Sequence, residues 1–148
     1  MNKRIFSLLI VLIATFTVLS VCASEELVSH DFGKFNMDIY DDQSVSESSG
    51  SVGQSIYNIT NKDGSTGFNV IYYDTSNTDG NNNTTDFVLN TACKDISDKK
   101  TDGNITTFNT DNGIDKIYCV SSSDNTKVAV IIGADVKMND IVTSVNFK

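Results

Sequence analysis

Apolar and polar residues alternate in several short segments of the chain, a pattern typical of half-buried strands. In the first of them Phe35, Met37 and Ile39 share one face, while polar residues occupy the other. Alternation, or enrichment in β-branched and aromatic residues, predicts strands over residues 31–40, 55–60, 68–73, 104–109, 114–121 and 127–132. Asp63-Gly64 lies between the second and third segments and favours the tight turn of a hairpin.

Two other segments have the period of a helix, with apolar residues at the i, i+3, i+4 and i+7 positions. These residues are Leu89, Ala92, Cys93 and Ile96 in the first segment, and Met138, Ile141, Val142 and Val145 in the second. We expect the first helix to start with its cap at residues 84–86 and the second to have its cap at Asp135. Both segments are predicted as amphipathic helices.

The predicted element order is β-β-β-α-β-β-β-α, which is typical of an α+β domain. Short hairpins make neighbouring strands antiparallel. We therefore expect a single antiparallel sheet of about six strands, with the two helices covering one face. Residues 41–54 and 74–84 are rich in polar and turn-forming residues and are predicted as exposed loops.

The amino-terminal segment has the pattern of an export signal. Ile5 to Val21 contains no charged residue and follows Lys3 and Arg4. Small residues at Val21-Cys22-Ala23 suit cleavage after Ala23. The sequence therefore predicts a signal peptide at residues 1–23 and one secreted domain at residues 24–148, a length that fits a single core.

Two other interpretations of the same segment stay open. The seventeen residues from Ile5 to Val21 reach the lower limit for a helix that spans a bilayer, so the segment is alternatively an uncleaved anchor. Leu19-Ser20-Val21-Cys22 resembles a bacterial lipobox, with Cys22 as the lipidated residue, although Val21 stands where that box has a small residue. All three interpretations place residues 24–148 outside the cell or on the outer side of its envelope.

The chain is acidic, with a net charge of −8 at pH 7. Without Lys3 and Arg4, nine basic and nineteen acidic residues remain, which gives residues 24–148 a net charge of −10. This charge argues against nucleic acid and anionic lipid as partners, because both attract proteins through Lys and Arg. It favours solubility.

Cys93 and Cys119 are the two cysteines left in the predicted secreted domain. An even number in an oxidising compartment predicts one disulfide, which closes a loop of about 25 residues and pins the first helix to the sheet. Two buried free thiols are the alternative.

Candidate binding and modification residues are aromatic and amide side chains. The side of the sheet away from the helices is a candidate aromatic ligand face formed by Tyr57, Tyr72, Tyr73 and Tyr118. The alternative is that these tyrosines simply cover the sheet. Asn-x-Ser/Thr triplets make Asn58, Asn82, Asn83 and Asn104 candidates for glycosylation, although a chain rich in Asn, Ser and Thr also forms such triplets by chance.

No residue group predicts catalysis, a metal site or a cofactor. His30 is the only histidine, which argues against catalytic triads and ordinary zinc sites. Residues 74–80 and 109–115 have the oxygen donors of a calcium loop but lack the glutamate at its twelfth position, so they are predicted as turns. The mature glutamates all lie in segments predicted to be flexible: Glu25, Glu26 and Glu47.

The chain shows a resemblance in its order of features. An export signal precedes the opening strand Phe32-Gly33-Lys34-Phe35-Asn36-Met37-Asp38-Ile39, and an Asn- and Asp-rich middle and a helical end follow. These features resemble small secreted proteins of unknown function from methane-producing archaea. The element order of residues 30–148 resembles the PsbP/Mog1-like α+β fold, whose members bind proteins or act as accessory subunits. The resemblance carries no site residues and implies a binding or accessory role.

Together these observations predict a secreted or cell-envelope module without enzymatic activity or cofactor. We expect it to bind an extracellular protein, a glycan or a small ligand through the uncovered sheet face or its loops. A secreted hydrolase that uses Asp residues and a structural envelope component that assembles through strand edges are the alternatives.

Overall fold

The computed structural model describes residues 26–50, 53–74, 83–93, 96, 98–110, 115–134 and 137–148. Several predicted features lie outside these ranges: the signal peptide with Cys22, the sequon at Asn82, most of the 74–84 loop, and the helix cap at Asp135. Within the described ranges, every helix falls short of the length and hydropathy that crossing a bilayer requires.

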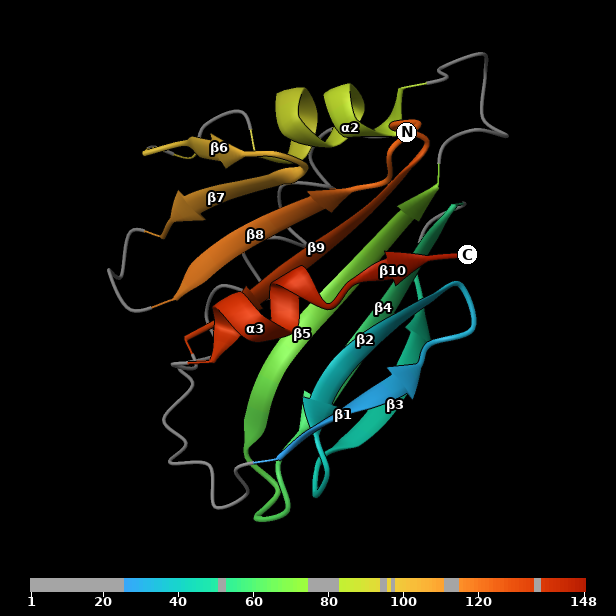
Figure 1. Cartoon of the computed structure of the whole chain (residues 1–148), viewed down its shortest axis with the longest axis vertical. Coiled ribbons are helices and arrows are strands. Elements are labelled where there is room, and N and C mark those ends of the chain that lie inside the picture. Colours follow the sequence, from blue (N-terminus) through green and yellow to red (C-terminus); the bar gives the residue numbers. More distant parts are fainter. Residues whose placement is uncertain are drawn as a thin grey trace.

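The described chain is an α+β structure of antiparallel strands and two short helices (Figure 1). The strands are β1 (Leu27–Asp31), β2 (Phe35–Tyr40), β3 (Ser44–Ser49), β4 (Gln54–Thr60), β5 (Thr66–Asp74), β6 (Lys100–Asp102), β7 (Ile105–Asn109), β8 (Lys116–Ser121), β9 (Lys127–Gly133) and β10 (Asn146–Phe147). The helices are α2 (Thr84–Phe87), which continues into a π-helical turn, η1 (Val88–Ala92), and α3 (Met138–Thr143). Strand β2, the β4–β5 hairpin and strands β7 to β9 confirm the segments predicted from alternation.

The strands form two sheets, so the prediction of a single six-stranded sheet is wrong. The large sheet has seven strands in the order β3-β4-β5-β9-β8-β7-β6, and the small sheet has three in the order β1-β2-β10. The strands missed by the sequence pattern are short or lie at sheet edges. All three residues of β6 are exposed, for example, so burial imposes no alternation on them.

Residues 44–49 illustrate the same effect within the predicted 41–54 loop. They form β3, which pairs along its whole length with β4 at the edge of the large sheet. Five of its six side chains are exposed. The loop prediction is wrong for these residues because a polar edge strand needs only backbone hydrogen bonds on one side.

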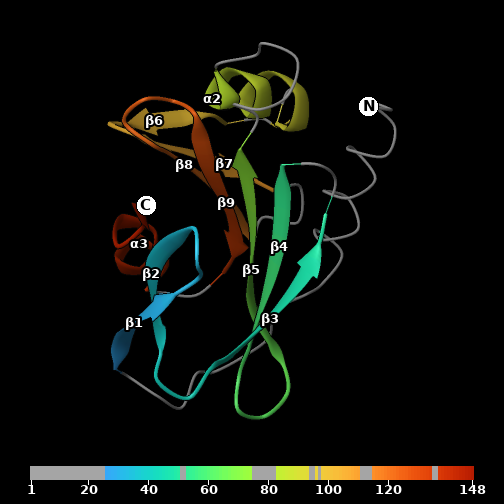
Figure 2. The ribbon, with the colours of Figure 1, turned by 90° about the vertical axis from the view of Figure 1, so that its right-hand side faces the viewer.

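Both faces of the large sheet are covered, whereas the sequence predicts cover on one face only. The small sheet and α3 pack on the face that carries Val70, Tyr72 and Ile131, and Figure 2 shows β1, β2 and α3 on the same side of the central strands. Helix α2 and turn η1 pack on the other face, over a cluster that includes Ile71 and Val130. The two helices therefore lie on opposite faces, because an amphipathic pattern identifies the buried side of a helix but not the sheet face it meets.

Phe35 of β2 attaches the small sheet to the large one. Its side chain is fully buried. The ring stacks on Phe32 with a centroid separation of 4.7 Å and on Tyr72 with 5.8 Å, and it meets Tyr57 edge-on at 5.7 Å. Each aromatic pair of this kind contributes about 0.5–1.5 kcal/mol beyond the burial of apolar area.

The first predicted helix is shorter than its apolar spacing suggests and starts one residue earlier. Asn83 is the N-cap, and its side-chain oxygen accepts a 2.9 Å hydrogen bond from the amide of Asp86. The α-helical part ends at Phe87, and the π-turn then carries the chain to Cys93, whose amide donates to the carbonyl of Val88. The π-turn places Cys93 against the sheet.

Candidate ligand groove

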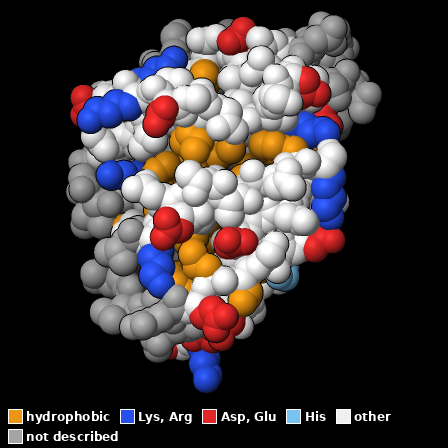
Figure 3. Space-filling view, viewed as in Figure 1, with side chains coloured by type: hydrophobic (Ala, Val, Ile, Leu, Met, Phe, Trp, Pro, Cys, Tyr) orange, Lys and Arg blue, Asp and Glu red, His pale blue; other side chains and the backbone are white. Residues whose placement is uncertain are grey.

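A groove of about 660 Å³ lies between α3 and the outer strands of the large sheet. Its walls are formed by Lys100, Thr101 and Asp102 of β6, Ile105 and Thr107 of β7, Tyr118 of β8, and Asn139, Val142 and Thr143 of α3. Figure 3 shows hydrophobic side chains at the bottom of a hollow between α3 and β8. The volume is within the range of sites for small ligands, roughly 300–1,000 Å³.

The strand register explains why these side chains share one face. Lys100 is opposite Thr107, and Thr107 is opposite Tyr118, so the three form one row across β6, β7 and β8. Asp102 and Ile105 belong to the next row on the same face. Because side chains alternate along a strand, residues two apart on β6 point the same way.

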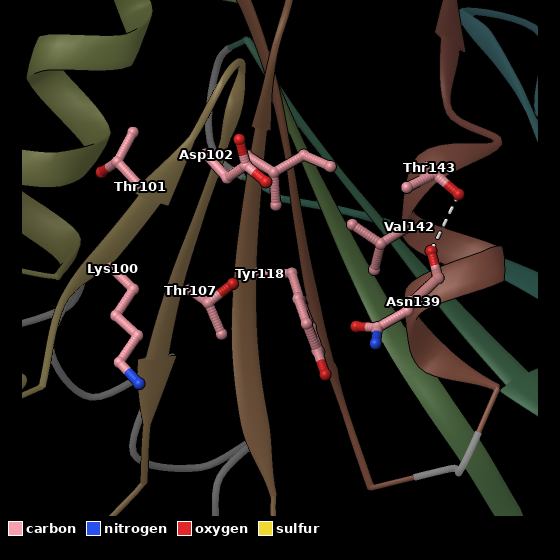
Figure 4. A pocket seen from close by; sticks show the side chains of 9 residues that line it. Lys100, Thr101, Asp102, Thr107, Tyr118, Asn139, Val142 and Thr143 are labelled. Atoms are coloured by element: carbon pink, nitrogen blue, oxygen red, sulfur yellow. Dashed lines mark hydrogen bonds between the residues drawn. The ribbon is translucent and has the colours of Figure 1, made fainter.

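Helix α3 forms the opposite wall because its buried side is held by the core. Met138, Ile141 and Val142 are each at most 2% exposed. Ser144, directly after the helix, accepts a 2.8 Å hydrogen bond from the amide of Asp38 in β2. Asn139 is exposed and is turned toward Tyr118 across the groove, as Figure 4 shows.

Several polar groups of the groove have no partner within the described part of the chain. The side chains of Lys100, Asp102, Thr107 and Asn139 make no hydrogen bond or ion pair there. Thr143 differs, because its hydroxyl donates to the carbonyl of Asn139 at 2.9 Å. Four polar side chains from three elements are therefore available to a ligand.

Tyr118 combines an apolar floor with a polar end. The residue is only 6% exposed. Its hydroxyl makes no hydrogen bond to the described residues. The hydroxyl oxygen is not fully buried, so it is accessible from the groove. Burial raises the pKa of this hydroxyl further above its usual value of 10.0, and the group is protonated and able to donate at neutral pH.

The four tyrosines of the predicted ligand face do not lie together. Tyr57, Tyr72 and Tyr118 point to the face covered by the small sheet and α3, whereas Tyr73 belongs to the cluster under α2. All four are at most 6% exposed. Tyr57 donates to the carbonyl of Phe32, and burial raises the pKa of Tyr72 to about 12. Of the four, Tyr118 is the one that lines the groove.

Comparisons of this chain with known protein families, curated proteins and solved structures find no similar protein. The groove must therefore be interpreted from its own chemistry.

The structure brings Cys93, directly after turn η1, close to Cys119 of β8. Their sulfur atoms are 3.7 Å apart and unbonded, and both residues are buried. The hydrogen bond between the two thiols lowers the pKa of Cys93, and the same bond together with burial raises the pKa of Cys119. The disulfide itself stays a prediction.

The described sequons differ in their surroundings. Asn58 is half-buried in the middle of β4, opposite Asn69. The side-chain nitrogen of Asn83 donates to Asp86, and that of Asn104, in the exposed β6–β7 turn, donates to the carbonyl of Ser121. Glycosylation would use this same nitrogen and replace one of its two hydrogens, so Asn83 and Asn104 would each keep a single side-chain N–H.

The sequence pattern missed most of the groove. Lys100 and Asp102 are polar residues just before the strand predicted at residues 104–109, and Thr107 lies within that strand. Asn139 is on the polar side of a predicted helix. All four are residue types that are common on protein surfaces. The one available signal was Tyr118, which the aromatic pattern had already selected.

Proposed function

We propose that this chain is a non-enzymatic binding module, exported from the cytoplasm, whose ligand lies in the groove between α3 and strands β6 to β8. The observation that carries the proposal is the convergence, around the apolar side chains of Ile105, Tyr118 and Val142, of polar groups that have no partner among the described residues. A mostly apolar concave surface with a few convergent polar groups is the usual form of a small-ligand site.

The lining supports binding more than hydrolysis. Asp102 is the one carboxylate among the described residues that line the groove. Hydrolysis by two carboxylates requires a second one within roughly 5–10 Å. The single histidine also lies elsewhere, on β1, where its ring packs edge-on against Phe32 at 4.8 Å.

Export would place Cys93 and Cys119 in an oxidising compartment, where disulfides form. We propose that Cys93 and Cys119 are joined by exchange with a disulfide of an oxidising partner protein. The Cys93 thiolate attacks that disulfide, and the Cys119 thiol, after losing its proton, then displaces the partner from the mixed disulfide. Two protein thiols become one bridge, and the partner leaves with two reduced thiols.

A fragment screen tests the binding function. We expect small fragments added to the isotope-labelled exported protein to shift the amide NMR signals of Thr107, Tyr118 and Asn139. Thr107→Trp should abolish these shifts, because a large ring in this half-buried position fills the groove, and strands accept Trp readily. Thr66→Trp is the matched control on β5, away from the groove.

The screen also has a result that contradicts the proposal. Fragments that shift only signals outside the groove, or that bind the Thr107→Trp protein as well as the original, would place the ligand elsewhere. The dispersion of the NMR spectrum shows in the same experiment that each variant is folded.

A further inference from the structure

We propose that the groove binds a neutral oligosaccharide, an inference that rests on the proposed binding function and specifies its ligand class. The argument uses three properties of the lining: its charge, its hydrogen-bonding groups and the position of its apolar surface.

The charge of the lining favours an uncharged ligand. Among the described residues that line the groove, Lys100 and Asp102 are the two charged ones, so the formal charge of this described lining is zero. The chain as a whole carries −8. An anionic ligand would approach against this field, and a cationic ligand would have to accommodate the Lys100 ammonium group. A neutral ligand meets neither penalty.

The hydrogen-bonding groups favour a ligand rich in hydroxyls. Asp102 can only accept and Lys100 can only donate, whereas the Thr107 hydroxyl, the Tyr118 hydroxyl and the Asn139 amide do both. A sugar hydroxyl also donates and accepts, so neighbouring hydroxyls satisfy all of these groups with one kind of functional group. An apolar ligand would instead leave these groups desolvated and unpaired, which is unfavourable, most of all for the charged Lys100 and Asp102.

The apolar surface matches the remaining part of a sugar. Figure 4 shows Tyr118 between Thr107 on one side and Asn139 and Val142 on the other, so apolar and polar surface alternate across the groove. A pyranose ring has the same division, with C–H groups on its faces and hydroxyls at its rim. Lys100 and Asp102 are two positions apart on one strand face, a spacing of about 7 Å, which lets them reach hydroxyls on different parts of a short oligosaccharide.

The test is an NMR titration of the exported protein with size-matched trisaccharides. Maltotriose, cellotriose and triacetylchitotriose are neutral, trigalacturonate is anionic, and deacetylated chitotriose is cationic. We expect at least one neutral trisaccharide to shift the amide signals of Tyr118 and Asn139 in a saturable way, and the charged ones to bind at least about 10-fold more weakly, a difference of about 1.4 kcal/mol.

Variants of the two charged residues show that the groove itself binds the sugar. Asp102→Asn and Lys100→Ala should each weaken binding of the neutral trisaccharide by about 10-fold. Asp140→Asn and Lys62→Ala change charge equally at exposed residues outside the groove and should leave binding unchanged.

Other outcomes separate the ligand class from the site. If the neutral sugars cause no shift, while triglycine or screened fragments shift the same groove signals, the saccharide proposal is wrong and the binding function stands. Preferential binding of trigalacturonate would also overturn it. If neither sugars nor fragments perturb the groove, both proposals fail.

Discussion

Reduction of the proposed Cys93–Cys119 bridge should destabilise the protein by an amount that can be calculated from its position. The two residues are 26 positions apart, and the sulfur atoms lie 3.7 Å from each other. A bond requires about 2.05 Å. Cys119 is held inside the sheet between β7 and β9, so the movement must come from η1, which ends beside Cys93.

The chain-entropy relation for a closed loop of 26 residues gives a stabilisation of about 3.5 kcal/mol at 25 °C. This is a large part of the usual stability of a small domain, about 5–15 kcal/mol. With a urea m-value of about 1.5 kcal/mol/M, the midpoint of unfolding should fall by about 2 M when the bridge is reduced.

The assay is urea unfolding of the exported protein, followed by far-ultraviolet circular dichroism with and without a phosphine reductant. A double variant, Cys93→Ala with Cys119→Ala, is the control, since its midpoint should not respond to the reductant. Mass determination before and after reduction should show the gain of two hydrogens. A mass that does not change, with both thiols open to alkylation in the unfolded state, would refute the bridge, as would a midpoint unaffected by the reductant.

Two further predictions concern the packing and the turns. Phe35→Ala should lower the free energy of unfolding by about 3–5 kcal/mol, because it removes a fully buried ring between the two sheets. Val28→Ala at a 39% exposed position should change it by less than about 0.5 kcal/mol in the same denaturation experiment, and equal effects would contradict the role of Phe35. Hydrogen bonds from Ser122 and Thr126 lower the pKa of Asp124 to about 2. The folded-state pKa is depressed, so this carboxylate stabilises the fold above its ordinary pKa of 3.8 and loses that effect as the pH falls through about 2. Thermal unfolding of Asp124→Asn should therefore differ from the original protein at pH 7 and converge with it near pH 2; a constant difference would exclude this cause.

Part of the candidate site was accessible from local patterns. The alternation of residues 114–121 predicted β8, and the aromatic pattern selected Tyr118 as a candidate ligand residue. The even number of cysteines predicted a Cys93–Cys119 disulfide, and the structure places the two sulfur atoms 3.7 Å apart. The strand prediction succeeds because it depends on the positions of residues within one element and on burial of one of its faces, whereas the role of Tyr118 as a ligand residue stays a prediction.

The position of β6 was beyond such patterns. Lys100, Thr101 and Asp102 are exposed on both faces, and only their pairing with β7 makes them a strand. Backbone hydrogen bonds specify no side-chain type, so an edge strand of this kind leaves no periodic signal.

Local periodicity along this chain was enough to define its main strands, the buried side of α3 and its α+β class, because each of these follows from burying one face of one element. The division into two sheets, the placement of the helices on opposite faces and the groove were decided only in the folded molecule. The pairing of β6, β7 and β8 brings Lys100 and Tyr118 to one face, and Asn139 joins them only when α3 packs beside β8. Long-range packing of this kind depends on which apolar faces fit together, and the pattern within a single element does not contain that information.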